Sequence, residues 1–126
     1  MESVFTKILL ALVILPVIII SGIFLRKKSR PYNKALFSLH KTVSVVFIIF
    51  SVLLIRRFII SQAVEGLLSY LLILSVAFMI TSFATGALQS FEKAPPEAVN
   101  RVHRISSYLM FPFIPLTFIL IYNIIN

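Results

Sequence analysis

Residues 4–25 read VFTKILLALVILPVIIISGIFL, a run in which Lys7 is the only charged residue. A helix of about 20 apolar residues crosses the roughly 30 Å of bilayer hydrocarbon. Similar runs follow at about 34–55, 66–89 and 98–122, and the short segments between them leave no room for a soluble domain. The sequence therefore predicts an all-α membrane protein, a single domain of four transmembrane helices in an up-down-up-down bundle.

The composition agrees with a membrane protein. Hydrophobic residues make up 60% of the chain and the mean hydropathy is +1.05, whereas soluble domains contain roughly 45–50% apolar residues. The first run is longer than the 7–15 residues of a signal-peptide core, so we expect it to be a retained helix. The chain has no cysteine, which excludes disulfides, iron–sulfur clusters and thiolate metal sites in it.

The formal net charge of +8 is unevenly distributed. The basic residues gather around the first and third predicted loops: Arg26, Lys27, Lys28, Arg30, Lys34 and Lys41 at the first, and Lys93, Arg101 and Arg104 at the third. Because short cytoplasmic loops collect Lys and Arg, we expect these two loops inside and both termini outside. The basic loops would then meet anionic membrane lipid and the cytoplasm, so the charge does not predict a nucleic-acid partner.

The two halves of the chain carry a similar pattern. A small residue and a glycine end one run, a proline-containing loop follows, and a histidine with a basic neighbour begins the next run: Ser21-Gly22 with His40-Lys41, and Thr85-Gly86 with His103-Arg104. Each glycine precedes its histidine by 17 or 18 residues. The identity is thin, so ancestral duplication is one hypothesis for the pattern.

His40 and His103 are the only histidines. Each is expected six or seven residues into its helix, about 10 Å along the axis. The second and fourth helices run in the same direction and are diagonal in a simple bundle, so the two imidazoles would face each other at one depth. Gly22 and Gly86 would leave space in the same layer. This arrangement predicts a haem between the two histidines, with its edges over the glycines.

The surrounding residues would complete such a site. Lys41, Arg101 and Arg104 lie near the inner surface, where long basic side chains could reach the haem propionates. The second nitrogen of each imidazole needs an acceptor, either a carbonyl of the preceding helical turn or one of the nearby serines Ser38, Ser44 and Ser106. Two other interpretations remain open: histidines that lie in the headgroup region, and a non-haem metal or proton-transfer role.

The pattern resembles the cytochrome b family in its broad sense, including cytochrome b561-like membrane proteins. The resemblance implies a four-helix bundle that holds haem b, with His40 and His103 as axial ligands and Gly22 and Gly86 as spacers. Many members hold two haems with four histidines. This chain has only two histidines, so the resemblance implies one haem b near the cytoplasmic face.

The leading functional hypothesis is an electron-transfer subunit without independent catalytic activity. It would exchange electrons with a quinone or a redox partner subunit. The parent assembly would be a respiratory, photosynthetic or other redox complex, and both a homo-oligomer and a hetero-oligomer remain open. The alternative is a non-redox structural or assembly subunit of a membrane complex. A small transporter or pore is disfavoured because none of the four acidic residues lies within a predicted span: Glu2, Glu65, Glu92 and Glu97.

Overall fold

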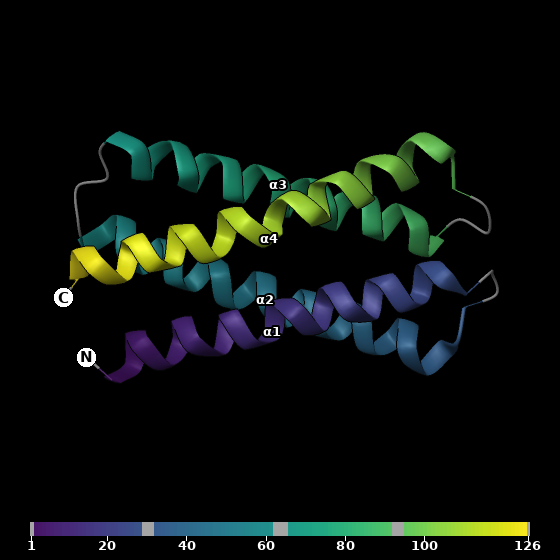
Figure 1. The fold of residues 1–126 in the computed structure, drawn as a ribbon, viewed down its shortest axis with the longest axis horizontal. Helices are drawn as coiled ribbons and strands as arrows, with labels where there is room; N and C mark the ends of the chain where they lie inside the picture. The colour runs from purple at the N-terminus through teal and green to yellow at the C-terminus, as the bar shows by residue number, and fades with distance from the viewer. Residues whose placement is uncertain (1, 29–31, 62–65, 92–94, 126) are drawn as a thin grey trace. The chain divides into compact units, whose positions relative to one another are not determined.

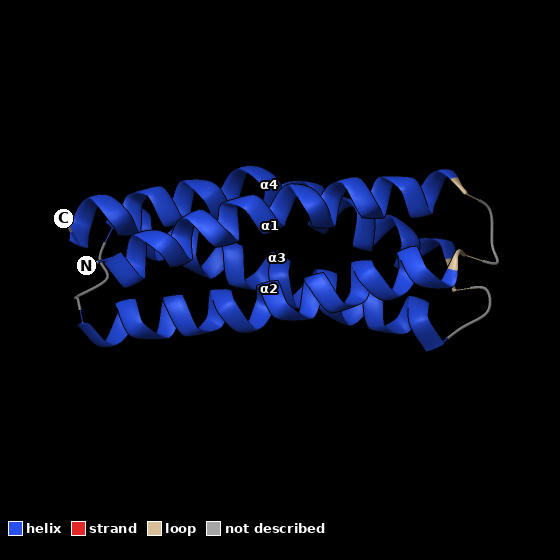
Figure 2. Ribbon diagram, turned by 90° about the horizontal axis from the view of Figure 1, so that it is seen from below, coloured by secondary structure: helices blue, strands red, loops and turns tan. Residues whose placement is uncertain are grey.

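The computed structural model describes residues 2–28, 32–61, 66–91 and 95–125, and nearly all of them are helical. The helices are α1 (Glu2–Lys27), α2 (Lys34–Ser61), α3 (Gly66–Phe91) and α4 (Glu97–Ile125). The described residues contain no strand (Figure 2). All four helices are long and apolar enough to cross a membrane. The predicted all-α, multi-pass membrane fold is therefore confirmed.

The helices form two units, each an antiparallel hairpin. One hairpin consists of α1 and α2, and the other of α3 and α4 (Figure 1). That the two hairpins form a single domain stays a prediction. Some residues of the predicted loops lie outside the described residues: Arg30, Pro31, Glu65, Glu92 and Lys93.

The second helix of each hairpin begins after a residue that accepts hydrogen bonds from its first turn, Asn33 through its side chain and Pro96 through its main-chain carbonyl. Asn33 Oδ1 accepts hydrogen bonds from the main-chain N–H groups of Ala35 and Leu36, at 3.0 and 3.2 Å. The Pro96 carbonyl accepts from the N–H groups two and three residues beyond Glu97, at 3.0 and 3.3 Å. An asparagine cap and a proline just before the first helical turn are common ways to start a helix. Because each cap fixes the first residue of its helix, it also fixes how far along the helix the following histidine lies.

The helix α2 is longer than predicted. The predicted end at Ile55 was wrong, because the helix continues through Arg56 and Arg57 to Ser61. Arginine is a good helix former, and its long side chain can reach out of an apolar environment while the backbone stays helical. Phe58 is 1% exposed, so burial of this ring also stabilises the last turns.

Many buried positions recur in the two hairpins. A shift of 64 residues superimposes buried positions of α1 on buried positions of α3: Ile8 and Leu72, Ala11 and Ser75, Leu15 and Met79. A shift of 63 residues does so for α2 and α4: Phe47 and Met110, Ser51 and Ile114, Leu54 and Thr117, Ile55 and Phe118, Phe58 and Ile121. The repeat predicted from a few residues therefore extends along the buried faces of the helices. We call residues related by these shifts counterparts.

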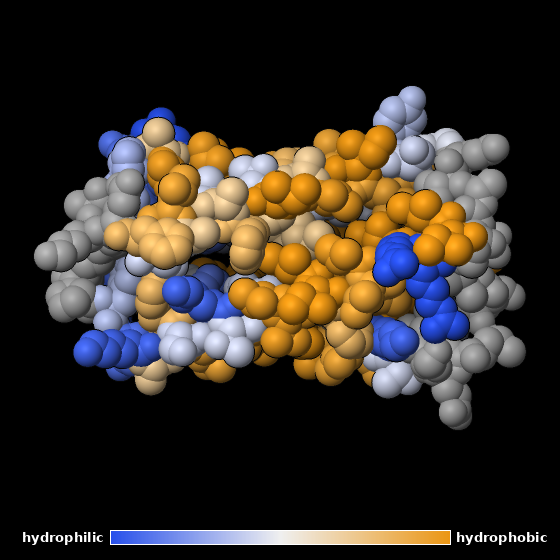
Figure 3. Space-filling view, turned by 180° about the vertical axis from the view of Figure 1, so that it is seen from behind, coloured by the Kyte–Doolittle hydropathy of each residue, from blue (hydrophilic) through white to orange (hydrophobic). Residues whose placement is uncertain are grey.

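Many large apolar side chains point outward. Ile60, Leu67 and Ile73 are each more than 60% exposed. Apolar side chains cover much of the surface between the ends of the helices (Figure 3). In a chain of membrane-spanning helices, such side chains are in contact with lipid.

Candidate functional site

In the first hairpin, a hydrogen bond from α1 orients the ring of His40. Ser21 Oγ lies 2.9 Å from His40 Nδ1. The Ser21 hydroxyl donates its own hydrogen to the Ile18 carbonyl, at 2.9 Å. A hydroxyl has one hydrogen to donate, so both contacts form at once only when Ser21 accepts from the ring, and this assigns the His40 proton to Nδ1.

The second hairpin repeats this contact with one more acceptor. His103 Nδ1 lies 3.1 Å from Thr85 Oγ1 and 3.0 Å from the Ser82 carbonyl oxygen. The Thr85 hydroxyl donates to the Thr81 carbonyl, at 2.6 Å. A carbonyl oxygen can only accept, so His103 also carries its proton on Nδ1.

The two imidazoles therefore share one tautomer, assigned from their hydrogen bonds. A neutral imidazole with its proton on Nδ1 has its lone pair on Nε2. That nitrogen is then the one able to coordinate a metal, while the bond at Nδ1 fixes the ring orientation and increases ligand basicity. Each hairpin thus presents one oriented imidazole of the kind that metal centres use.

Each glycine lies against the imidazole of its own hairpin. A Cβ atom added to Gly22 would lie 3.2 Å from His40 Cε1, and one added to Gly86 would lie 3.1 Å from His103 Cε1. Carbon atoms normally approach to about 3.5–4.0 Å, so a side chain here would push on the ring. The sequence predicts that these glycines face a porphyrin edge. The structure adds this second role, and the porphyrin contact stays a prediction.

The histidines occupy equivalent places in their hairpins. Each lies six residues after the first residue of its helix, Lys34 for His40 and Glu97 for His103. This offset corresponds to about 9 Å along the helix axis. The predicted position of each histidine along its helix is therefore correct.

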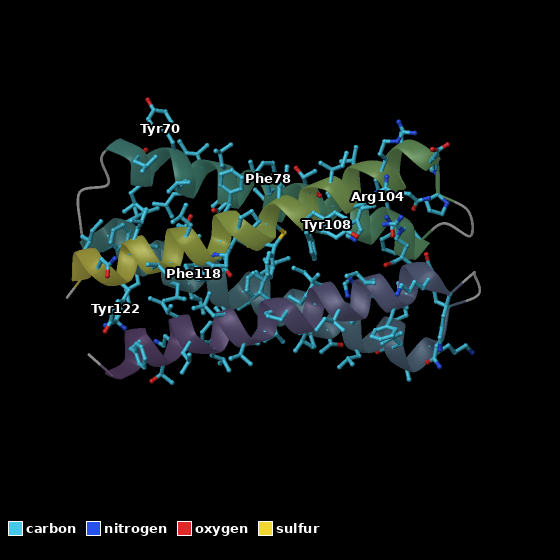
Figure 4. All side chains as sticks on the ribbon, in the orientation of Figure 1. Tyr70, Phe78, Arg104, Tyr108, Phe118 and Tyr122 are labelled. Carbon is cyan, nitrogen blue, oxygen red and sulfur yellow. The ribbon has the colours of Figure 1, made fainter. Side chains whose placement is uncertain are left out.

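The three predicted propionate partners lie at exposed positions. The Lys41 amine is 5.3 Å from the centre of the Phe37 ring, one turn closer to the start of α2. Arg101 forms an ion pair of 2.8 Å with Glu97. Arg104 is near the start of α4, one turn before Tyr108 (Figure 4). An exposed ion pair such as that of Arg101 contributes little to the free energy of folding. Exchanging Glu97 for another anionic partner would therefore cost Arg101 little.

The serines suggested as ring acceptors have other partners. Ser44 Oγ donates to the main-chain carbonyl of His40, at 2.7 Å, and Ser106 Oγ donates to main-chain carbonyls of its own helix. Ser38 is exposed. The suggestion of Ser44 and Ser106 was wrong, because a serine one turn after a residue on a helix reaches that residue's carbonyl more easily than its ring.

The true acceptors were visible in the sequence as a different signal. Ser21 and Thr85 each stand directly before the glycine that contacts the ring. From the sequence alone, these pairs indicate only small residues near the helix ends. The Ser82 carbonyl carries no sequence signal, because any residue supplies one.

Hydroxyl pairs also connect the helices of the second hairpin. Ser82 Oγ donates to Ser106 Oγ at 2.8 Å, and Ser75 Oγ lies 2.9 Å from Thr117 Oγ1. Such pairs between membrane helices contribute about 0.6 kcal/mol on average. Because Ser82 also holds the His103 ring through its carbonyl, these contacts help to fix the position of that ring.

Among the described residues, no three His or carboxylate side chains are close enough together to hold a metal ion. The chain matches no protein-family model, and no curated protein or solved structure is detectably similar to it.

Proposed function

We propose that this chain is a membrane cytochrome b subunit in which Nε2 of His40 and Nε2 of His103 ligate one haem b. The observation that carries the proposal is the contact of each ring, through Nδ1, with a hydroxyl of the neighbouring helix, from which the shared Nδ1–H tautomer is assigned. In each hairpin a hydroxyl that has already donated its hydrogen accepts from the imidazole. This is the orientation and protonation state that a haem ligand needs.

The residues present suit a haem better than a bare ion. A porphyrin supplies four nitrogen ligands itself, so two imidazoles complete the coordination. The chain contains two histidines and no cysteine, and its helices are otherwise mainly apolar. When bound, haem would supply one-electron redox chemistry. With both histidines bound to the iron, no position would remain for oxygen.

Other side chains would position the group and set its properties. Ser21, Thr85 and the Ser82 carbonyl hold the two rings in place through Nδ1. Lys41 and Arg104 directly follow the histidines and would pair with the propionates, together with Arg101. We also propose that Gly22 and Gly86 keep the helix surface low enough for a porphyrin edge to approach.

The topology expected from the charge distribution supports a proposal for how this subunit transfers electrons. By the charge distribution, the loops that precede α2 and α4 face the cytoplasm and the termini face outward. A single haem near one surface does not carry electrons across roughly 30 Å of hydrocarbon. We therefore propose that the chain exchanges electrons with a quinone or a partner redox subunit, as part of a respiratory, photosynthetic or other redox complex.

The test is a reduced-minus-oxidised absorption spectrum of the purified chain. We expect b-type bands and the electron paramagnetic resonance signal of low-spin, six-coordinate iron. His40→Ala or His103→Ala should abolish the low-spin signal. Ser51→Ala is the matched control, because this buried residue lies on the same helix as His40, more than three turns away. It should leave the spectrum unchanged.

A colourless preparation from cells supplied with haem precursors would overturn the proposal and favour the structural-subunit alternative. A spectrum that is unchanged in both histidine variants would overturn it as well, since the chain offers no other histidine.

A further inference from the structure

Four exposed cations surround the loop end of the first hairpin. Arg26, Lys27 and Lys28 follow one another at the end of α1, and Lys34 is the first residue of α2. We call these four residues the basic cluster. The sequence contains no acidic residue between Glu2 and Glu65, so this hairpin has no carboxylate near the cluster.

The second hairpin lacks this cluster, although it shares the histidine pattern. The counterparts of the four cations are not basic: Ser90, Phe91, Glu92 and Glu97. By contrast, Lys41 and Arg104, which follow the histidines, are counterparts that keep their charge. The basic cluster is therefore separate from the shared histidine pattern, and it points to a function that only the first hairpin has.

The electrostatics of the two ends also differ. In the second hairpin, Glu97 pairs with Arg101 at 2.8 Å, so part of the charge there is balanced internally. In the first hairpin, five cations lie within nine positions of the chain, Arg30 together with the four residues of the basic cluster. Like charges at such short separation repel one another, and this repulsion is relieved when an anion from outside binds between them.

The surroundings of the cluster indicate which anion. Phe24 is 52% exposed, and its carbonyl accepts a hydrogen bond of 3.3 Å from the N–H of Lys28, the residue that follows α1. Leu39 of α2 is 49% exposed. These apolar side chains continue from the cations toward the middle of the membrane-spanning helices, whereas a soluble anion would use the cations alone.

We propose that the basic cluster binds the headgroup of an anionic phospholipid, with an acyl chain along Phe24. The phosphate would accept hydrogen bonds from the lysine and arginine side chains at the membrane surface. The site is independent of the histidines, and it makes the first hairpin the lipid-anchored half of the chain.

The test measures lipid selectivity in the intact protein. The chain is reconstituted in phosphatidylcholine vesicles with a trace of spin-labelled phosphatidylglycerol or spin-labelled phosphatidylcholine. The motionally restricted fraction of each label gives its relative association with the protein. We expect phosphatidylglycerol to be preferred at low salt, and the double variant Lys28→Gln/Lys34→Gln to weaken that preference by about fivefold for each cation removed.

The matched control is Arg56→Gln/Arg57→Gln, which removes two exposed cations from the other end of α2. It should retain the preference, and circular dichroism should show both double variants to be equally helical. An equal loss in the control would overturn the proposal, because net charge alone would then explain the selectivity. Displacement of the spin-labelled lipid by millimolar glycerol phosphate would also overturn it, in favour of a site for soluble phosphates. The haem spectrum should be unchanged in both variants, which separates this test from that of the proposed function.

Discussion

The tautomer of the two imidazoles leads to a sharp prediction for Ser21→Ala. In the wild-type chain without haem, we expect both histidines to carry their proton mainly on Nδ1. Removal of the Ser21 hydroxyl takes away the acceptor that lies 2.9 Å from His40 Nδ1. His40 is partly buried, and loss of an acceptor from an N–H shielded from water costs about 1–3 kcal/mol. The ratio of the two tautomers of His40 should therefore move toward Nε2–H by a factor of about 5 to 150.

The same change in the second hairpin should have a smaller effect. In Thr85→Val, His103 Nδ1 still donates to the Ser82 carbonyl at 3.0 Å. We expect its tautomer ratio to shift by less than about fivefold, because one of two acceptors remains. Ser44→Ala is the matched control, since Ser44 contacts the main chain of His40 rather than its ring.

The assay is ¹⁵N solid-state NMR of histidine-labelled protein in lipid at about pH 8, where an ordinary imidazole is neutral. With only two histidines in the chain, the spectrum contains four ring nitrogens, and single-histidine variants assign them. If Nε2–H is the major form of either ring in the wild-type chain, the reasoning is refuted. The same holds if Ser44→Ala changes the ratio as much as Ser21→Ala does.

Three further predictions concern stability, measured by unfolding in detergent mixtures. Ser75→Ala should cost about 0.5–1.5 kcal/mol, because the Ser75 hydroxyl pairs with Thr117 at 2.9 Å in a buried contact; a Thr117→Val background should remove most of this cost. Ser51→Ala should be neutral or stabilising, because Ser51 Oγ is buried without a hydrogen-bond partner; a loss above 1 kcal/mol would contradict this. Gly86→Ala should cost about 1 kcal/mol, since the added Cβ would lie 3.1 Å from a His103 ring that its hydrogen bonds hold in place; an unchanged midpoint would show that the ring moves freely.

The fold was largely predictable because the decisive signal is local. Runs of about 20 apolar residues define membrane helices without any tertiary information, and the caps at Asn33 and Pro96 lie where the sequence changes character. The end of α2 was missed because Arg56 and Arg57 were interpreted as the start of a loop. The burial of Phe58, which stabilises the helix beyond them, is a tertiary contact that the sequence does not reveal.

The candidate site was predictable only in part. Its histidines stood out because imidazoles are rare in apolar runs and because the two occur at equivalent positions. Their acceptors were not found, since a bond from His40 to Ser21 depends on how two helices face each other in rotation. The contact between Gly86 and His103 depends on the same rotation, which hydrophobic periodicity constrains poorly in helices that are apolar all round.

Because counterpart positions are buried in both hairpins, the packing of each hairpin can be compared with that of the other. Phe47 and Met110 fill equivalent interior places with different shapes, and Ser51 and Ile114 do so with different polarity. Exchanging the two members of a pair keeps the overall composition constant. The exchange changes the side-chain volume buried in each hairpin. The two halves of this 126-residue chain can therefore be compared position by position, like two aligned sequences. The hydroxyl, the glycine and the imidazole occur in both halves, whereas the residues packed around them differ.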